Sequence, residues 1–335
     1  MDSINNYLWG ESRVFRNMEY IYAVYKAGSF SAAAKELYIT QPCLSAMIKK
    51  TEMQLGVPIF DRNTKPLRLT EYGIQYIAYL EKIQGLEGEF EQYLSDVRGL
   101  RTGHLSIGAN TVLASFVLPV LIQRFKTLYP GIQVQMVEGS RSYLEDALIH
   151  GKLDLILDNC QLDSDIYSQY RLGPEHILIA AHKEIHDAQA LKDFCLTHED
   201  ILVGRHIKAD TPALSLKTFA DSPVIALRTG TDTRLRMDTI FQQAGIHADI
   251  QLEVYQLTTA YNIACTGLGW TLVSDTLLYK MPSSPDMCYY KLNSDVTTRM
   301  IYMSHKRLRY VPLAMQKFMD TTIATLADGI TEAID

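Results

Sequence analysis

Residues 28–62 hold two short helical patterns separated by a tight turn, and this stretch limits the possible folds more than any other. The first helix is expected over about Ser31–Tyr38, where consecutive alanines favour helix. Thr40 is a suitable N-cap for a second helix, and Pro42 fits its first turn, where a missing N–H costs nothing. The sequence therefore predicts a helix-turn-helix at about residues 30–49.

The second helix should run to Leu55 and present two different faces. One face carries an apolar stripe that suits a buried core. Gln41, Ser45 and Lys49, spaced by four residues, share another face. An amide, a hydroxyl and an ammonium group are suited to base edges and phosphates. On periodicity alone, a helical hairpin without nucleic-acid binding remains an equal alternative.

Four sequence fragments follow one another in this part of the chain with consistent spacing. They are Gly28-Ser29-Phe30-Ser31-x-Ala33-Ala34, Thr40-Gln41-Pro42-x-Leu44-Ser45-x-x-Ile48, Glu52-x-x-Leu55-Gly56-x-x-Ile59-Phe60-x-Arg62 and Leu69-Thr70-x-x-Gly73. Together they resemble the DNA-binding domain of the LysR-type transcriptional regulators, although Thr51 and Ile59 stand where that family usually has leucine. The resemblance implies a winged helix-turn-helix on double-stranded DNA. Its implied contacts are Gln41 and Ser45 to bases, Ser31, Lys49 and Arg62 to phosphates, and Pro42 shaping the start of the helix.

A two-stranded wing is expected at Ile59–Leu69, with Pro66 confining the segment to an edge or a turn. Arg62 begins this wing and Lys65 lies near its tip. Both are therefore placed to reach phosphates or a minor groove, the alternative being a solvated surface base.

Charge supports nucleic-acid binding once it is counted by segment. The whole chain has a net charge of −6. Residues 18–70 carry seven Lys and Arg against four Asp and Glu, or +3, whereas residues 71–98 carry two against six, or −4. Positive charge is thus concentrated in the helix-turn-helix region, as phosphate binding requires.

A long helix from Thr70 to about Arg98 is predicted next. Its apolar residues follow a heptad frame, which favours a dimerising linker helix over one that covers only its own domain. A dimer, or a dimer of dimers, would hold two reading helices at a fixed spacing. The frame places Tyr76, Ile83, Phe90 and Val97 at one position and Leu80 and Leu94 at the other.

From Gly103 onward, strand and helix patterns alternate, which indicates parallel sheet with covering helices. Fragments such as Leu118-Pro119 and Gly151-Lys152-Leu153-Asp154-Leu155 resemble the effector domain of the LysR-type regulators, which is like a periplasmic binding protein of type 2. The expected fold class is α/β with an N-terminal winged helix-turn-helix. The expected domains are an extension at 1–17, the winged helix-turn-helix at 18–70, a linker helix at 71–98 and a two-lobed effector domain at 103–335, with lobe I at about 103–172 and 282–335 and lobe II at about 173–281.

Ligands of two-lobed α/β domains bind beyond the C-terminal ends of strands, where loops and helix N-termini present N–H groups. Hydroxyl groups in such loops suit a small anionic effector, although several could simply cap helices. The candidates are Asn110, Thr111, Ser140, Ser142, Arg205, Thr229 and Thr231.

Cysteines and histidines give no sign of a metal site, a cofactor or catalysis. The five cysteines are far apart in sequence with no CxxC, so reduced thiols are expected, with Cys160 and Cys195 the candidates for redox sensing. His176 and its neighbours have no matching carboxylate or cysteine at ligand spacing. No catalytic motif is found, and we predict that the protein is not an enzyme.

The sequence therefore predicts a LysR-type transcriptional regulator that binds DNA as a dimer or tetramer and responds to a small molecule. No apolar run has membrane length and the N-terminus lacks a secretory signal, so we expect it in the cytoplasm. Two alternatives remain: a small-molecule-binding protein whose N-terminal helices are structural, and an α/β enzyme with a dimerisation domain.

Overall fold

A computed structural model describes residues 14–15, 17–62, 64, 66–97, 103–186, 189–307 and 309–327. Lys65 and most of the predicted extension lie outside these residues. The chain divides into two compact units, Met1–Phe90 and Glu91–Asp335.

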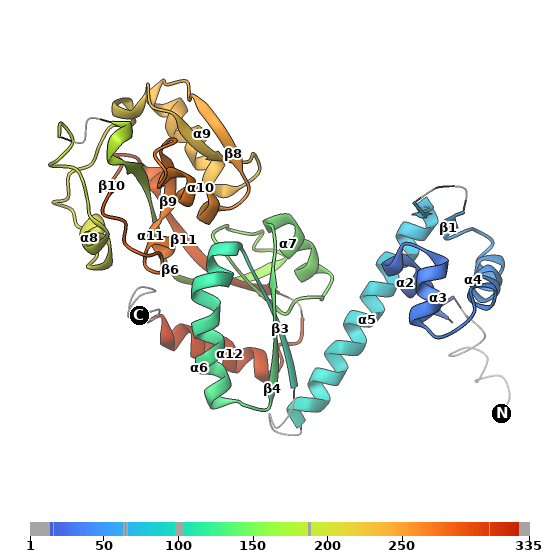
Figure 1. Ribbon diagram of the computed structural model, residues 1–335. Coiled ribbons are helices and arrows are strands. Elements are labelled where there is room, and N and C mark those ends of the chain that lie inside the picture. Colours follow the sequence, from blue (N-terminus) through green and yellow to red (C-terminus); the bar gives the residue numbers. More distant parts are fainter. Residues whose placement is uncertain are drawn as a thin grey trace. The chain divides into compact units, whose positions relative to one another are not determined.

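The first unit is a small helical cluster. The helices α2 (Met18–Ala27), α3 (Phe30–Glu36) and α4 (Gln41–Leu55) gather beside the N-terminal part of α5 (Glu71–Val97; Figure 1). Their shared core contains Ile21, Val24, Ala33, Ala34, Leu44, Ile48, Tyr76, Ile77 and Leu80.

The helix-turn-helix forms where the local signals predict it. The side chain of Thr40 accepts a hydrogen bond from the N–H of Cys43 at 3.4 Å, and α4 ends at Gly56 in the left-handed conformation. The preceding helix is shorter than predicted. It ends at Glu36, because the chain must turn sharply and Tyr38 takes a φ of 55°.

Thr51, which stands where a leucine is common in the LysR-type regulators, is buried without an unpaired hydroxyl. It is 1% exposed, its Oγ1 donates to the carbonyl of Met47 at 3.3 Å, and it accepts from Asn17 Nδ2 at 3.4 Å. The polar side chain is therefore accommodated by hydrogen bonds that leucine would not need.

The wing is two-stranded, as predicted. Its strands β1 (Phe60–Asp61) and β2 (Arg68–Leu69) pair antiparallel, with Phe60 opposite Leu69. Each strand is only two residues long.

Helix α5 begins at a capping threonine, since Thr70 Oγ1 accepts the N–H of Gly73 at 2.9 Å. The residues of the predicted heptad frame lie in two different environments. Tyr76 and Leu80 are 7% and 0% exposed because they complete the core of the first unit, whereas Leu94 is 40% exposed. The first part of the frame therefore belongs to the core of this unit.

A seven-stranded sheet organises the second unit. Its order is β10-β6-β11-β5-β3-β4, with β9 also pairing with β6. Strand β3 is parallel to both β4 and β5, whereas β11 is antiparallel to β5 and β6. The bounds are β3 (Gly103–Ala109), β4 (Ile132–Glu138), β5 (Leu155–Asp158), β6 (Tyr167–His182), β9 (Thr271–Ser274), β10 (Met287–Tyr290) and β11 (Thr298–Lys306). A separate parallel pair is formed by β7 (Val224–Leu227) and β8 (Ile250–Val254).

Helices cover this framework. The predicted helix at 113–129 opens with a π-helical turn, η1 (Leu113–Val117), before α6 (Leu118–Leu128). The other helices are α7 (Arg141–Ile149), α8 (His198–Leu202), α9 (Asp232–Ala244), α10 (Leu257–Ala264), α11 (Asp275–Leu278) and α12 (Leu313–Thr325), with short 3₁₀ turns η2 (Lys183–Ile185), η3 (Arg205–Ile207), η4 (Leu216–Phe219) and η5 (Asp295–Thr297).

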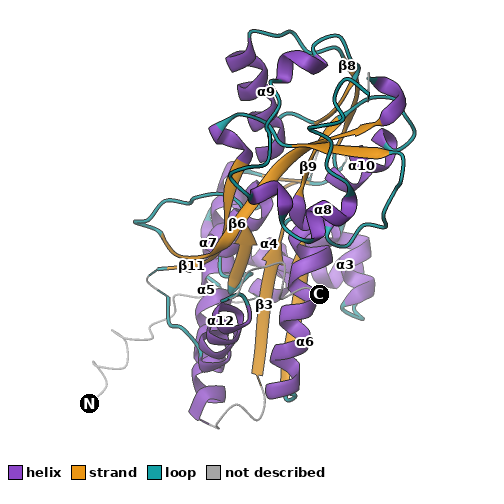
Figure 2. Cartoon of the chain, turned by 90° about the vertical axis from the view of Figure 1, so that its left-hand side faces the viewer, coloured by secondary structure: helices purple, strands orange, loops and turns teal. Residues whose placement is uncertain are grey.

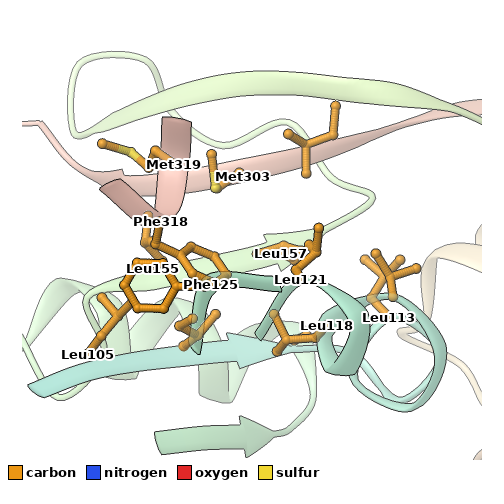
Figure 3. Packing of buried hydrophobic residues seen from close by; sticks show 14 of the residues in the cluster. Leu105, Leu113, Leu118, Leu121, Phe125, Leu155, Leu157, Met303, Phe318 and Met319 are labelled. Carbon is orange, nitrogen blue, oxygen red and sulfur yellow. The ribbon is translucent and has the colours of Figure 1, made fainter. Parts of the chain in front are cut away.

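Each lobe of the second unit has its own apolar core. In the first lobe, side chains of α6 and α12 meet above the sheet, and the rings of Phe125 and Phe318 lie 5.3 Å apart, edge to face (Figure 3). In the second lobe, Trp270 is 1% exposed and packs between Phe219 and Phe241.

The sequence analysis predicted that the chain returns to the first lobe at about residue 282, but the return comes later in the chain. Strand β10 pairs with the C-terminal end of β6, and its Tyr289 bridges Leu196, so it stays in the second lobe. The return comes along β11, which pairs with the N-terminal half of β6 and with β5 (Figure 2).

Two cysteines lie together despite their sequence separation of 93 residues. Cys195 and Cys288 form a disulfide with a Cα–Cα distance of 5.4 Å, so the expectation of reduced thiols is wrong for this pair. The cause is the bridge next to it, in which Leu196 and Tyr289 exchange two backbone hydrogen bonds of 2.8 and 3.0 Å. Sequence spacing could not show this. Cys43, Cys160 and Cys265 are free thiols.

Within the described residues, no helix combines the length and the apolar character needed to cross a membrane.

Gly73 is expected to tolerate no side chain. A Cβ there would lie 2.0 Å from the carbonyl oxygen of Ile59, whereas one at Gly88 in the same helix would meet nothing within 4 Å. Gly73→Ala should lower the free energy of unfolding by about 2–3 kcal/mol through overpacking. Gly88→Ala, the matched control, should raise it by about 0.5–1 kcal/mol through helix propensity. Urea unfolding of both variants checks this, and equal effects would contradict the close contact.

Candidate nucleic-acid interface and effector cleft

The predicted reading face of α4 is present and largely exposed. Gln41, Pro42 and Lys49 are exposed, and Ser45 is half-buried. The Thr40 cap and the packing of Leu44 and Ile48 fix this helix on the first unit, so the polar face points away from the core. Ser31 is exposed in the first turn of α3.

Arg62 connects the wing to the reading helix. Its Nη1 donates to Ser45 Oγ at 3.2 Å and its Nη2 donates to Glu52 Oε2 at 2.9 Å. The guanidinium also lies over the ring of Phe30, 5.1 Å from its centroid. The side chain is 38% exposed and a guanidinium has five donors, so it can hold this junction and still donate to a phosphate.

Glu52 is the acceptor on which this junction depends, and sequence reasoning gave it no role. Its Oε1 accepts the N–H groups of Ile59 and Phe60 at 2.8 and 3.2 Å, while its Oε2 pairs with Arg62. The available signal was that the carboxylate of Glu52 precedes the start of the buried wing strand by seven and eight residues. Its partners, however, are backbone groups whose position only the fold reveals.

In the second unit, Asn110 is the polar centre of the loop after β3. Its Nδ2 donates to Asp158 Oδ1 and Asn159 Oδ1, both at 3.0 Å, and its Oδ1 accepts the N–H of Leu113 at 3.1 Å. The predicted residue thus joins the C-terminal ends of the parallel strands β3 and β5.

A buried ionic network continues from there into the second lobe. Asn159 Nδ2 donates to Glu175 Oε2 at 2.8 Å, and the same oxygen accepts Arg299 Nε at 2.6 Å. Arg299 Nη1 then donates to Asp232 Oδ2 at 2.7 Å, and Arg236 Nε reaches that oxygen at 2.8 Å. These side chains come from β6, β11, α9 and the end of β5, so charge pairing ties the two lobes together.

The titration of nearby groups reflects this network. Burial alone would raise the pKa of Asp232, but the charges and hydrogen bonds of Arg299 and Arg236 hold it below its usual value. Burial raises the pKa of the Cys160 thiol to about 11, with Asp158 and Asp232 adding to the rise and Arg141 opposing it. Groups of both lobes therefore act on one region.

Hydroxyl groups among the predicted effector residues already have partners. Thr111 Oγ1 donates to Glu138 Oε1 at 2.6 Å. Ser140 caps α7 by accepting the N–H of Tyr143, and its Oγ lies 3.3 Å from that of Ser142. Thr231 caps α9, directly before Asp232 of the ionic network.

Arg205 and Thr229, the remaining predicted effector residues, also lie outside the ionic network. Arg205 is 54% exposed and pairs with Asp200 at 3.0 Å, between η3 and α8. Thr229 is exposed in the loop after β7. The residues that sequence reasoning missed in the network are Asn159, Glu175, Asp232, Arg236 and Arg299, because their pairing joins segments up to 124 residues apart.

Two family models match this chain. The model described as the bacterial regulatory helix-turn-helix protein, lysR family, matches residues 15–74, and the model described as the LysR substrate binding domain matches residues 98–327. The chain belongs to the LysR family. Both matches agree with the two parts predicted from the sequence.

Relatives of this LysR-family chain match along almost its whole length. The uncharacterized HTH-type transcriptional regulator YcgK of Bacillus subtilis is 27% identical over 321 residues, 94% of this chain and 95% of YcgK. Full-length CbnR, solved in complex with its target DNA, superposes with a TM-score of 0.65 at 19% identity, covering 92% of this chain and 98% of CbnR. A full-length OxyR variant from Pseudomonas aeruginosa gives a TM-score of 0.65 at 20% identity, covering 91% of this chain and 93% of OxyR.

Glu52→Ala should destabilise the first unit of this LysR-family protein. The change would leave the buried N–H groups of Ile59 and Phe60 without their acceptor, so the free energy of unfolding should fall by about 2–3 kcal/mol. Glu36→Ala, an exposed acid on α3, is the matched control and should change it by less than about 0.5 kcal/mol. Urea unfolding followed by circular dichroism checks both, and a silent Glu52→Ala variant would contradict the assigned role.

Arg299→Met should destabilise the second unit, because Glu175 would lose its buried counter-charge and Asp232 would lose one of its two arginine partners. Breaking a buried ion pair costs about 3–5 kcal/mol. Arg307→Met, an exposed arginine just beyond the same strand, should cost less than about 0.5 kcal/mol. Adding Glu175→Gln to Arg299→Met should recover part of the loss in thermal unfolding. No recovery would mean that Arg299 acts mainly through packing.

Proposed function

We propose that this LysR-family transcriptional regulator binds a specific DNA site through α4 and the wing, as a dimer or tetramer, and that a small molecule in the second unit modulates this binding. The proposal rests on the two LysR family models, which match the N-terminal helix-turn-helix region and the second unit. The exposed polar face of the capped helix α4 supports it. The solved CbnR complex with target DNA, although only 19% identical, has the same fold.

Within this proposal, the side chains divide into two kinds of DNA contact. Gln41 and Ser45 contact base edges, while Ser31, Lys49 and Arg62 bind phosphates and Pro42 sets the start of the helix. Lys65, at the tip of the wing, is assigned to phosphates from the sequence alone. The position of Arg62 between Ser45 and Glu52 supports its role, because it places a cation directly beside the reading face.

Helix α5 is proposed as the dimerisation element. Besides the residues of α5 that are buried in the first unit, the helix carries apolar side chains on its surface. Tyr79, Leu86 and Leu94 are 55%, 65% and 40% exposed. Side chains of this size gain free energy when a partner helix covers them. The proposed domains are thus the winged helix-turn-helix at 18–70, the linker at 71–98 and the effector domain at 103–335.

The effector site is proposed at the ends of β3 and β5, around Asn110 and the ionic network. The N-termini of α7 and α9, where Ser140, Ser142 and Thr231 lie, supply the partial positive charge that would favour an anionic ligand. Thr111, Thr229 and Arg205 complete the proposed set. A ligand that binds one arrangement of the lobes better than another can change DNA affinity through a coupling of about 1–3 kcal/mol.

A regulator of transcription acts where DNA is, and we propose the cytoplasm as its location. The family is one of regulators, which argues against the alternative of an α/β enzyme. The other alternative, a small-molecule-binding protein with structural N-terminal helices, is separated from the regulator by DNA binding.

Purified protein should bind the DNA upstream of its own coding region more tightly than random DNA. Gln41→Ala/Ser45→Ala should reduce this binding to the level seen with random DNA, because base contacts carry the specificity. Lys49→Ala should weaken binding to both DNAs alike and lower the salt slope by about 1. Fluorescence anisotropy at several salt concentrations measures all three.

A matched control is Lys217→Ala, which removes an exposed cation from η4 in the second unit and should leave both affinities unchanged. Specific binding that survives the double substitution would move the specificity to the wing. If the wild type binds no DNA better than random DNA at any salt concentration, the regulator proposal fails and the small-molecule-binding alternative takes its place.

A further inference from the structure

Three side chains that are far apart in sequence meet in the second lobe. His176 lies on β6, His206 in the turn η3, and Asp275 is the first residue of α11. His176 Nδ1 lies 2.8 Å from Asp275 Oδ2, and His206 Nε2 lies 3.1 Å from the same oxygen. The three ligand atoms all lie within 4.8 Å of one another. The carboxylate that sequence spacing failed to supply for His176 is therefore Asp275, 99 residues away.

Backbone groups hold the carboxylate in a fixed orientation. Asp275 Oδ1 accepts the N–H of His176 at 3.0 Å and that of Thr276 at 2.9 Å. Ser274 caps α11 by accepting the N–H of Leu277, which fixes the start of the helix. Oδ2 is thereby left to face the two imidazoles, and such outer hydrogen bonds are what orient the ligands of metal sites.

The cluster places a negative charge in the protein interior. Asp275 is 4% exposed and His206 is 2% exposed. In the part of the chain that the structure describes, Asp275 forms ion pairs with the two histidines and with no lysine or arginine. Hydrogen bonds from backbone N–H groups and imidazoles stabilise this buried carboxylate, and a bound cation would add the positive charge that its surroundings lack.

We propose that His176, His206 and Asp275 form a Zn²⁺-binding site. Imidazole nitrogen and carboxylate oxygen are zinc ligands, and three protein ligands with a fourth open position make one of the two common zinc arrangements. The N–O separations of 2.8 and 3.1 Å are close to those between neighbouring ligands of a tetrahedral ion, about 3.3 Å for bonds of about 2.0–2.1 Å. Both separations are also ordinary hydrogen-bond lengths, so the ion would replace these two hydrogen bonds.

Access and ligand order also fit an ion. The side chain of His176 is 24% exposed, whereas that of His206 is fully buried. An ion can therefore enter past His176, and solvent or a small ligand can occupy the fourth position on that side. The buried pair, His206 and Asp275, would form the fixed part of the site.

The position of this site gives it a link to the interlobe network. Glu175, which pairs with Arg299, directly precedes His176 on β6. An ion would join β6, η3 and α11 at the point where β6 carries the charges that hold the lobes together. Occupancy would therefore stiffen the second lobe next to the proposed effector site.

Zinc uptake by untagged full-length protein tests the proposal. Protein stripped with EDTA is titrated with Zn²⁺ in competition with a chromophoric chelator. The chelator takes up Zn²⁺ from weak surface sites, so the titration measures only sites that bind the ion more tightly than the chelator does. Wild type should take up one ion per chain. His176→Gln and His206→Gln should weaken uptake by more than about 100-fold, since outer-shell changes alone cost about 10–100-fold.

The control is His182→Gln, which removes a histidine from the same strand outside the cluster and should leave uptake unchanged. Circular dichroism confirms folding, and the partly exposed position of His176 makes its variant usable even if His206→Gln does not fold. Added Zn²⁺ should raise the thermal midpoint of wild type and of His182→Gln but not that of His176→Gln. Equal uptake by wild type and His176→Gln, or no uptake by either, would overturn the site and leave only a hydrogen-bonded His–Asp–His cluster.

Discussion

The backbone pairing of β6 is the constraint on which the second unit depends. This strand extends from Tyr167 to His182, pairs with β11 over its first half and with β9 and β10 over its second. Because this one strand pairs with partners from both lobes, its backbone hydrogen bonds join the two lobes in one continuous ladder. Glu175 and His176 lie at the crossing, where the pairing partner changes. The interlobe ion network and the His–Asp–His cluster both start from these two adjacent residues.

Local signals were sufficient to predict the helix-turn-helix. Thr40, Pro42 and Gly56 act within a few residues of where they stand, so the second helix has the predicted start and end. The wing and the succession of strands and helices after Gly103 follow from the same kind of information, and the family models agree with both parts. The assignment of individual side chains to DNA or effector goes beyond what local pattern can establish, and it stays a prediction.

Features that depend on long-range proximity were not predictable from one sequence. Cys195 meets Cys288, His176 meets Asp275, and Arg299 meets Glu175, across 93, 99 and 124 residues. No periodicity links such positions, because their proximity results from strand order. The heptad frame of α5 is ambiguous for a related reason. Tyr76 and Leu80 have the spacing of a coiled-coil seam, but the core of the first unit lies against the same face.

Ser45 is already hydrogen-bonded in the structure, and this has a consequence for selectivity. Its hydroxyl accepts from Arg62, whose charge is balanced by Glu52. A hydroxyl has one hydrogen and two acceptor lone pairs, so the Arg62 contact leaves the hydrogen and one lone pair for a base edge. In the proposed DNA complex, a base that offers an acceptor would use the hydrogen, whereas a base that offers a donor would share the oxygen with the positive guanidinium. The junction between wing and helix would in this way favour acceptor-bearing base edges opposite Ser45.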